Sequence, residues 1–165
     1  MSTDNGIIET DGEAAVIRFE RHLPHPIEAV WAAITEPAQR LAWFGETVLD
    51  TEAGRIEMLP EDPPAAADAK RMTGRILVWD PPHVFEHEWH QRIVEDGVVR
   101  YELSETATGT LLRFTHRGLS VRNARGFIPG THAFFDRLDA HLAGAEPPAW
   151  SERYAALAPS YPAWS

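Results

Sequence analysis

Apolar and polar residues alternate along the first part of the chain and then change period. In residues 14–23, AAVIRFERHL, the alternation from Ala15 onwards predicts a strand with one buried face. From Ile27 the apolar residues instead fall at positions i, i+3, i+4 and i+7, which is the stripe of an amphipathic helix. Pro37 ends that helix and begins a second short one over residues 37–43.

Short strand candidates separated by turn residues follow these helices. ETVLDT and GRIEML flank the tripeptide EAG, which predicts a β-hairpin over residues 46–59. The segment PEDPPAAADAK, residues 60–70, is rich in proline and alanine and is expected to form a surface loop. Four more strands are expected at residues 71–80, 84–92, 98–105 and 110–118. Their even spacing favours an antiparallel meander.

After Gly118 the apolar pattern returns to a helical period. It predicts a long helix over residues 130–143, ended by Gly144, and a short amphipathic helix at residues 150–157. Strands and helices therefore do not alternate, which disfavours parallel doubly wound folds. We predict an α+β fold in which a curved antiparallel β-sheet wraps around the long C-terminal α-helix, with two short helices after the first strand.

Length and composition suit a single globular domain. The chain has 165 residues, of which 44% are hydrophobic, enough for one sizeable core. We interpret residues 1–13 as a flexible leader, 14–145 as the domain and 146–165 as an aromatic C-terminal extension. The acidic start of the chain lacks the basic and apolar regions of a signal peptide, so a cytoplasmic location is expected.

The charge of the chain excludes several partners. A net charge of −10 and a single lysine, Lys70, argue against nucleic acid, because phosphate binding needs clustered Lys and Arg. No apolar run is long enough for membrane insertion. There is no cysteine, so disulfides, thiolate metal sites and cysteine nucleophiles are absent.

Four stretches in order resemble one known family. They are HPIEAVWAAITEPAQRLAWFG, GRILVWDPPHVFEHEW, TLLRFTHRGL and GTHAFFDRLDAHLAG, and the resemblance covers about residues 14–145. The sequence resembles the SRPBCC superfamily with its START-like, helix-grip fold, and within it the AHSA group, homologues of the activator of heat-shock-protein ATPase. The resemblance implies a cavity between the sheet and the long helix, where many relatives bind small apolar molecules and some act as cyclases or aromatases.

Strand alternation and the resemblance together suggest which residues line this cavity. Phe85, His87 and Trp89 share one strand face, and Phe114 and His116 share another. The ten residues expected in the lining are Trp43, Phe44, Trp79, Phe85, His87, Trp89, Tyr101, Phe114, His116 and Phe134. Each aromatic residue also has a simpler interpretation as core packing, and each histidine as a buried side chain bonded to a neighbour.

No residue is assigned a catalytic, cofactor or metal role. His83, His87 and His90 are the closest histidine cluster, but alternate strand positions point to opposite faces, so the three side chains are not expected to converge. His132 and Asp136 fall at i and i+4 on the expected helix, without an evident third ligand.

Three functions remain open. We favour binding of a small apolar or aromatic ligand without catalysis, by a monomer or homodimer. The alternatives are an enzyme of the polyketide cyclase, aromatase or hydrolase type that uses the cavity histidines, and a chaperone-associated interaction module. The aromatic extension, with Trp150, Tyr154, Tyr161 and Trp164, is expected to cover the cavity mouth, to meet a second subunit or to pack on its own domain.

Overall fold

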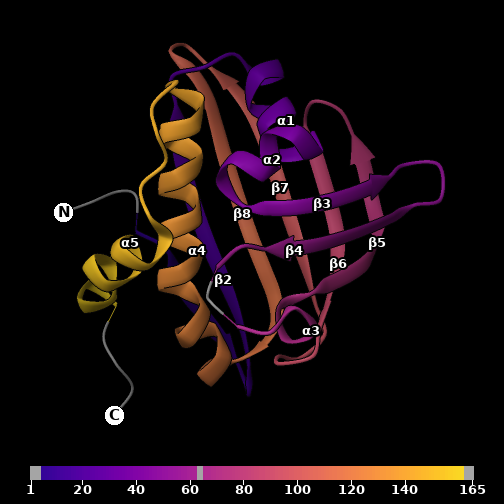
Figure 1. Ribbon diagram of the computed structural model, residues 1–165, viewed down its shortest axis with the longest axis vertical. Helices are drawn as coiled ribbons and strands as arrows, with labels where there is room; N and C mark the ends of the chain where they lie inside the picture. Colours follow the sequence, from indigo (N-terminus) through magenta and orange to yellow (C-terminus); the bar gives the residue numbers. More distant parts are fainter. Residues whose placement is uncertain (1–4, 63–64, 162–165) are drawn as a thin grey trace.

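The computed structural model describes residues 5–62 and 65–161, and in these residues the strands form one antiparallel sheet. The sheet has eight strands in this described part, in the order β1-β2-β8-β7-β6-β5-β4-β3 (Figure 1). The strands are β1 (Ile7–Asp11), β2 (Ala14–Leu23), β3 (Gly45–Asp50), β4 (Arg55–Pro60), β5 (Met72–Asp80), β6 (Val84–Gln91), β7 (Gly97–Thr106) and β8 (Gly109–Ser120). The helices are α1 (Ile27–Thr35), α2 (Pro37–Trp43), α3 (Ala67–Lys70), α4 (Val121–Leu142) and α5 (Trp150–Leu157), and a 3₁₀ turn follows at Ala158–Ser160.

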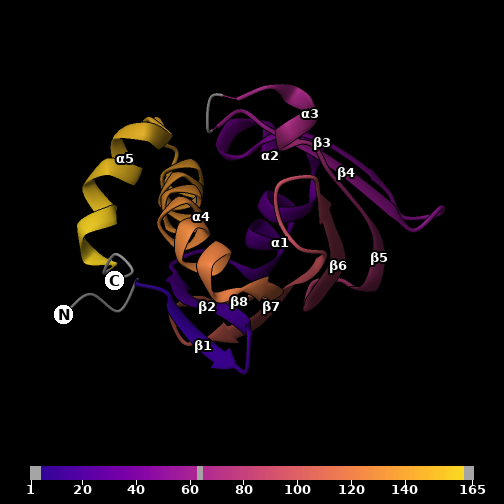
Figure 2. The same cartoon turned by 90° about the horizontal axis from the view of Figure 1, so that it is seen from below.

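The sheet bends around the long helix α4, as the sequence predicted. Figure 2 shows α4, α1 and α2 on the concave side of the sheet, with α5 packed on α4. The buried core lies between these layers and includes Ile17, Phe85 and Leu119. The α+β helix-grip fold, the hairpin and the meander are therefore confirmed.

The sheet begins earlier than expected. Strand β1 lies inside the segment that was interpreted as a flexible leader, and it pairs with β2 from Ile7 opposite Arg18 to Asp11 opposite Ala14. The tight connection uses Gly12, which has a φ of 64° and meets no neighbouring atom at its Cβ position. Ile8 packs against the core, so this edge strand covers apolar surface of the sheet.

Helix α4 also begins nine residues before the expected position 130. Ser120 precedes it, and the Ser120 side chain accepts a hydrogen bond from the Asn123 backbone N–H at 3.1 Å. The Glu95 carboxylate accepts bonds from the Ser120 backbone N–H and the Asn123 side chain, which holds the same turn from outside the helix. Pro129 lies within the helix, so tertiary packing here overrides the helix-breaking tendency of proline.

Candidate functional site

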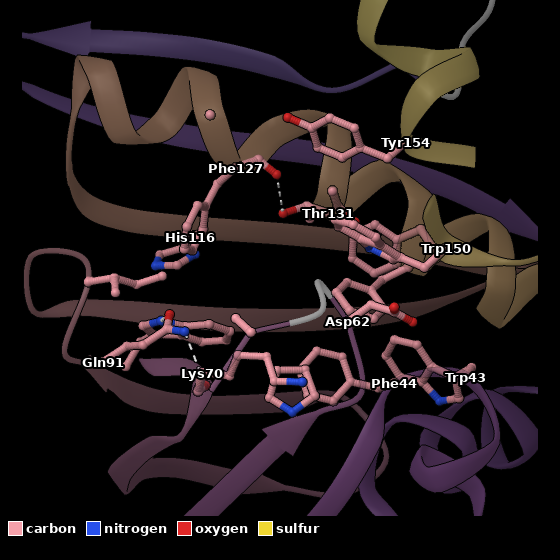
Figure 3. Close-up of a pocket in the computed structure, with 18 of the residues that line it drawn as sticks. Trp43, Phe44, Asp62, Lys70, Gln91, His116, Phe127, Thr131, Trp150 and Tyr154 are labelled. Atoms are coloured by element: carbon pink, nitrogen blue, oxygen red, sulfur yellow. Dashed lines mark hydrogen bonds between the residues drawn. The ribbon is translucent and has the colours of Figure 1, made fainter. Parts of the chain in front are cut away.

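A cavity of about 420 Å³ lies between the concave face of the sheet and helices α2, α3, α4 and α5 (Figure 3). Side chains from β6, β7 and β8 form one wall, and α4 forms the opposite wall. The aromatic residues in the lining are Trp43, Phe44, Trp89, Tyr101, Phe114, Phe127, Phe134, Phe135, Trp150 and Tyr154. The cavity is therefore mainly an aromatic, apolar space of the size that small-molecule sites have.

Seven of the ten residues expected in the lining are in it: Trp43, Phe44, Trp89, Tyr101, Phe114, His116 and Phe134. Residues on β7 and β8 keep strict alternation across the pair, with Tyr101 directly opposite Phe114 and Val99 opposite His116. Regular pairing of this kind puts alternate side chains on one face, so the inward residues of these two strands were readable from the sequence.

Trp79, Phe85 and His87 do not line the cavity. Trp79 pairs with Phe85 across β5 and β6 and lies on the same face, but it packs on Trp31 of α1, with ring centroids 5.2 Å apart, and remains 37% exposed. Phe85 does point inward, but α1 covers that part of the sheet, so the ring is fully buried core. An inward strand position therefore faces the cavity only where no helix covers it.

His87 is enclosed beneath the cavity wall rather than exposed in it. Its Nδ1 lies 2.9 Å from the Glu88 backbone oxygen, while Nε2 has no hydrogen-bond partner among the described residues. Burial, with the nearby positive charge of Arg40, lowers the pKa of His87 to about 4. His87 is therefore a neutral core imidazole at neutral pH.

Trp43 and Phe44 serve both as core and as lining. The Trp43 indole N–H donates to the Ala33 backbone oxygen at 2.8 Å, which fixes α2 against α1. The Phe44 ring lies 4.7 Å from the Phe134 ring of α4, at the edge of the cavity. Arg137 of α4 donates to the Trp43 backbone oxygen at 3.0 Å and so ties the end of α2 to α4.

Beneath these rings lies a buried cation that the sequence did not reveal. Arg40 is fully buried, and its guanidinium donates to Thr47 Oγ1, to the Ile34 backbone oxygen and to the thioether sulfur of Met58. The guanidinium carbon is 4.8 Å from the centre of the Phe44 ring, a cation–π contact. Burial lowers the pKa of Arg40.

Polar side chains gather at one end of the cavity. Figure 3 shows His116, Gln91 and Lys70 at that end, opposite the end formed by Trp43 and Phe44. Trp89 joins two of them, because its ring lies 4.9 Å from the His116 ring and its indole N–H donates to Gln91 Oε1 at 2.9 Å. Gln91 in turn donates to the Lys70 backbone oxygen at 3.1 Å.

His116 is the buried titratable group of this end. It is 2% exposed, and its Nε2 has no hydrogen-bond partner in residues 5–62 and 65–161. Burial, with a further contribution from His87, lowers the pKa of His116 to about 3. The imidazole is therefore neutral at neutral pH and is a weak base. Across the described part of the chain, no three His, Asp or Glu side chains are grouped so as to hold a metal ion.

The C-terminal extension completes the cavity wall. Trp150 and Tyr154 of α5 line the cavity, and the Trp150 indole N–H donates to the Gly130 backbone oxygen at 3.1 Å. Gly130 is necessary for this contact, since a Cβ at that position would lie 2.9 Å from Trp150 Cζ2. The extension therefore packs on its own domain and also lies at the cavity, which are two of the three arrangements expected from the sequence. Trp164 lies outside the described residues.

A second set of bonds attaches the extension to α4. The Tyr161 hydroxyl lies 2.7 Å from His132 Nδ1 and accepts a bond from the Gly6 backbone N–H at 2.8 Å. Asp136 pairs with Arg153 of α5 and with Arg21 of β2. Burial alone would raise the pKa of Asp136, but hydrogen bonds from His132 and Arg153 and the charge of Arg21 lower it. His132 and Asp136 thus belong to this attachment.

Comparison with known proteins agrees with this fold. CalU16 from Micromonospora echinospora is 24% identical, with a TM-score of 0.72, and the match covers 95% of this chain and 92% of that chain. The protein encoded by gene BPP1335 from Bordetella parapertussis is 29% identical, with a TM-score of 0.71, over 96% and 89% of the two chains. DynU16, from the dynemicin biosynthetic locus, is 20% identical, with a TM-score of 0.63, over 80% of this chain and 48% of that chain. No curated protein matches the chain.

The fold and the cavity define a helix-grip protein of the SRPBCC superfamily. The family model described as "Activator of Hsp90 ATPase homolog 1-like protein" matches residues 24–143, and the chain belongs to this family. The match ends before α5, so Trp150 and Tyr154 lie outside the matched residues. Within the described residues, no helix is long and apolar enough to cross a membrane.

Proposed function

We propose that this protein binds a small apolar or aromatic molecule in the cavity between the sheet and α4. The observation that carries the proposal is the cavity itself, about 420 Å³ in volume and lined by ten aromatic side chains. Aromatic walls with few polar groups favour ligands with flat apolar bodies, which gain from burial of apolar surface and from ring contacts.

Binding without catalysis is favoured over the enzyme alternative. General acid–base chemistry near pH 7 needs a group whose pKa lies near that pH. His116 lines the cavity with a pKa of about 3, and His87 lies outside the wall with a pKa of about 4. A neutral imidazole of this kind is suited to hydrogen bonding with a bound molecule rather than to proton transfer.

A neutral fluorescent probe tests the proposal. We expect 1-pyrenebutanol to bind the purified protein, with a rise in pyrene anisotropy that saturates at one probe per chain. Thr131→Trp adds a large side chain to the cavity wall on α4 and should abolish the saturable binding. Arg122→Trp adds the same side chain at an exposed position of α4 outside the lining and should leave binding unchanged.

Two results would contradict the proposal. One is absence of saturable binding by the unmodified protein, since the cavity would then be closed to such a molecule. The other is equal binding by Thr131→Trp and the unmodified protein, since the probe would then lie elsewhere. Native mass spectrometry before and after denaturation extends the test, because a ligand retained through purification is released only on unfolding.

A further inference from the structure

The polarity of the cavity is divided between its two ends, and this division limits the class of ligand. Trp43, Phe44 and Trp150 form an aromatic end, while His116 and Lys70 lie at the opposite end (Figure 3). A ligand that fills both ends therefore needs an apolar body and a polar head. The charges of the residues at the polar end indicate the chemistry of that head.

Lys70 supplies the positive charge at this end. It is the only lysine of the chain, and its side chain lines the cavity from α3. One ammonium hydrogen bond goes to the Glu61 backbone oxygen at 2.8 Å. An ammonium group has three donors, so further donors remain for a ligand acceptor. Asp62, the acidic residue of the lining, lies nearer the aromatic end in Figure 3, where it disfavours an anionic group.

His116 supplies a second, independent indication. Its side chain is almost fully buried in the cavity wall, and Nε2 faces Gly97 of β7, where a Cβ would lie 3.2 Å from it. The other ring nitrogen, Nδ1, has no hydrogen-bond partner among the described residues either, and it is the ring atom that a polar head in the cavity can contact. A neutral imidazole can donate one N–H to an acceptor oxygen.

We infer that the ligand is an apolar or aromatic acid, whose carboxylate lies at the Lys70 and His116 end and whose ring system lies between Trp43, Phe44 and Trp150. The inference rests on the proposed function and refines it from an apolar ligand to an acidic one. An ammonium–carboxylate hydrogen bond at a partly buried site is worth about tenfold in affinity. Binding of the acid is therefore expected to depend on Lys70, and binding of the matching alcohol is not.

The experiment compares 1-pyrenebutyrate with 1-pyrenebutanol, which share the ring system and chain and differ in the head group. We expect the unmodified protein to bind the butyrate about tenfold more tightly. Lys70→Met should remove this preference by weakening the butyrate alone, and Lys70→Arg should retain it. Arg113→Met makes the same change of charge on the exposed side of β8, outside the lining, and should leave both affinities unchanged.

Failure of this inference can be told apart from failure of the proposed function. If neither probe binds, the proposed function is wrong. If both bind equally and Lys70→Met changes neither, the cavity binds apolar molecules but the acidic head is wrong. A third readout is the ¹⁵N chemical shift of the His116 ring, which should move on binding of the butyrate, and an unmoved signal would overturn the placement of the head.

Discussion

Gly126 and Gly130 lie one turn apart on α4 and allow the docking of the C-terminal extension to be measured against an internal control. A Cβ at position 126 would meet no heavy atom within 4 Å, whereas one at position 130 would lie 2.9 Å from Trp150 Cζ2. Neither glycine has a positive φ, so alanine fits the backbone at both positions. The two substitutions therefore differ in the contact with Trp150.

The magnitudes follow from two opposing effects. Replacing glycine by alanine inside a helix stabilises it by about 1 kcal/mol, and this gain applies at both positions. At position 130 the new methyl group has to displace the rigid indole ring and strain its hydrogen bond to the Gly130 oxygen, and overpacking of this kind costs about 1–3 kcal/mol. Gly126→Ala should therefore raise the free energy of unfolding by about 1 kcal/mol, and Gly130→Ala should lie about 1–3 kcal/mol below it.

Urea unfolding followed by far-UV circular dichroism measures both values, since the midpoint moves with stability at constant slope. Hydrogen exchange of the Trp150 indole N–H adds a local readout, because Gly130→Ala should speed this exchange while Gly126→Ala should not. Equal stabilisation by the two substitutions would refute the reasoning, because it would mean that the indole does not rest on Gly130.

Two further predictions concern buried polar groups. His87 and His116 have pKa values lowered to about 4 and about 3 by burial, while the unfolded chain titrates near 6.5, so the unfolded state binds more protons below pH 6.5. The free energy of unfolding is therefore undiminished above pH 6.5 and falls by about 2 kcal/mol per imidazole between pH 7 and pH 5. His90 offsets part of this fall, because its hydrogen bond to Asp96 raises its pKa. Urea midpoints at the two pH values measure this fall, and His116→Phe should reduce it. A midpoint that does not change with pH would show that the imidazoles are hydrated in the folded protein. Tyr161→Phe removes the hydrogen bonds to His132 and Gly6 and should lower the free energy of unfolding by about 1–3 kcal/mol. Amide exchange at Gly6 should become faster, and unchanged exchange would mean that the bond from Gly6 is not formed.

Part of the cavity that the sequence predicted is built on regular strand pairing. Tyr101, Phe114 and His116 were assigned to the lining from alternation together with the family resemblance, and β7 and β8 pair without a register shift. Trp79 shows where the face of a strand is not sufficient information. It pairs with Phe85 on the inner face of the sheet, beyond the register shift between Ile76 and Val78, but Trp31 of α1 rather than the cavity lies against it.

The remainder of the site depends on contacts between segments far apart in the chain. Gly130 had the appearance of a helix start, but it lies within α4, and its lack of a side chain is explained by Trp150, twenty residues further on. Likewise, Arg40 is buried because α2 packs against β3 and β4, where Thr47 and Met58 accept its hydrogen bonds. No local pattern carries this information, since each feature requires knowledge of its partner.

The division between regular and irregular segments also separates the residues that set the fold from those to which we attribute the proposed choice of ligand. The strands and α4 that enclose the cavity fall mostly within residues 24–143, which match the family model. Lys70 comes instead from the proline-rich loop region and its short helix α3, and Trp150 and Tyr154 come from α5, beyond the matched residues. Substitutions in such segments leave the sheet intact, because the buried residues of α5, Trp150 and Leu157, pack against α4 and not in the main core. Under the proposed function, ligand preference should therefore change with Lys70 and α5, and the stability that α5 adds comes from its contact with α4.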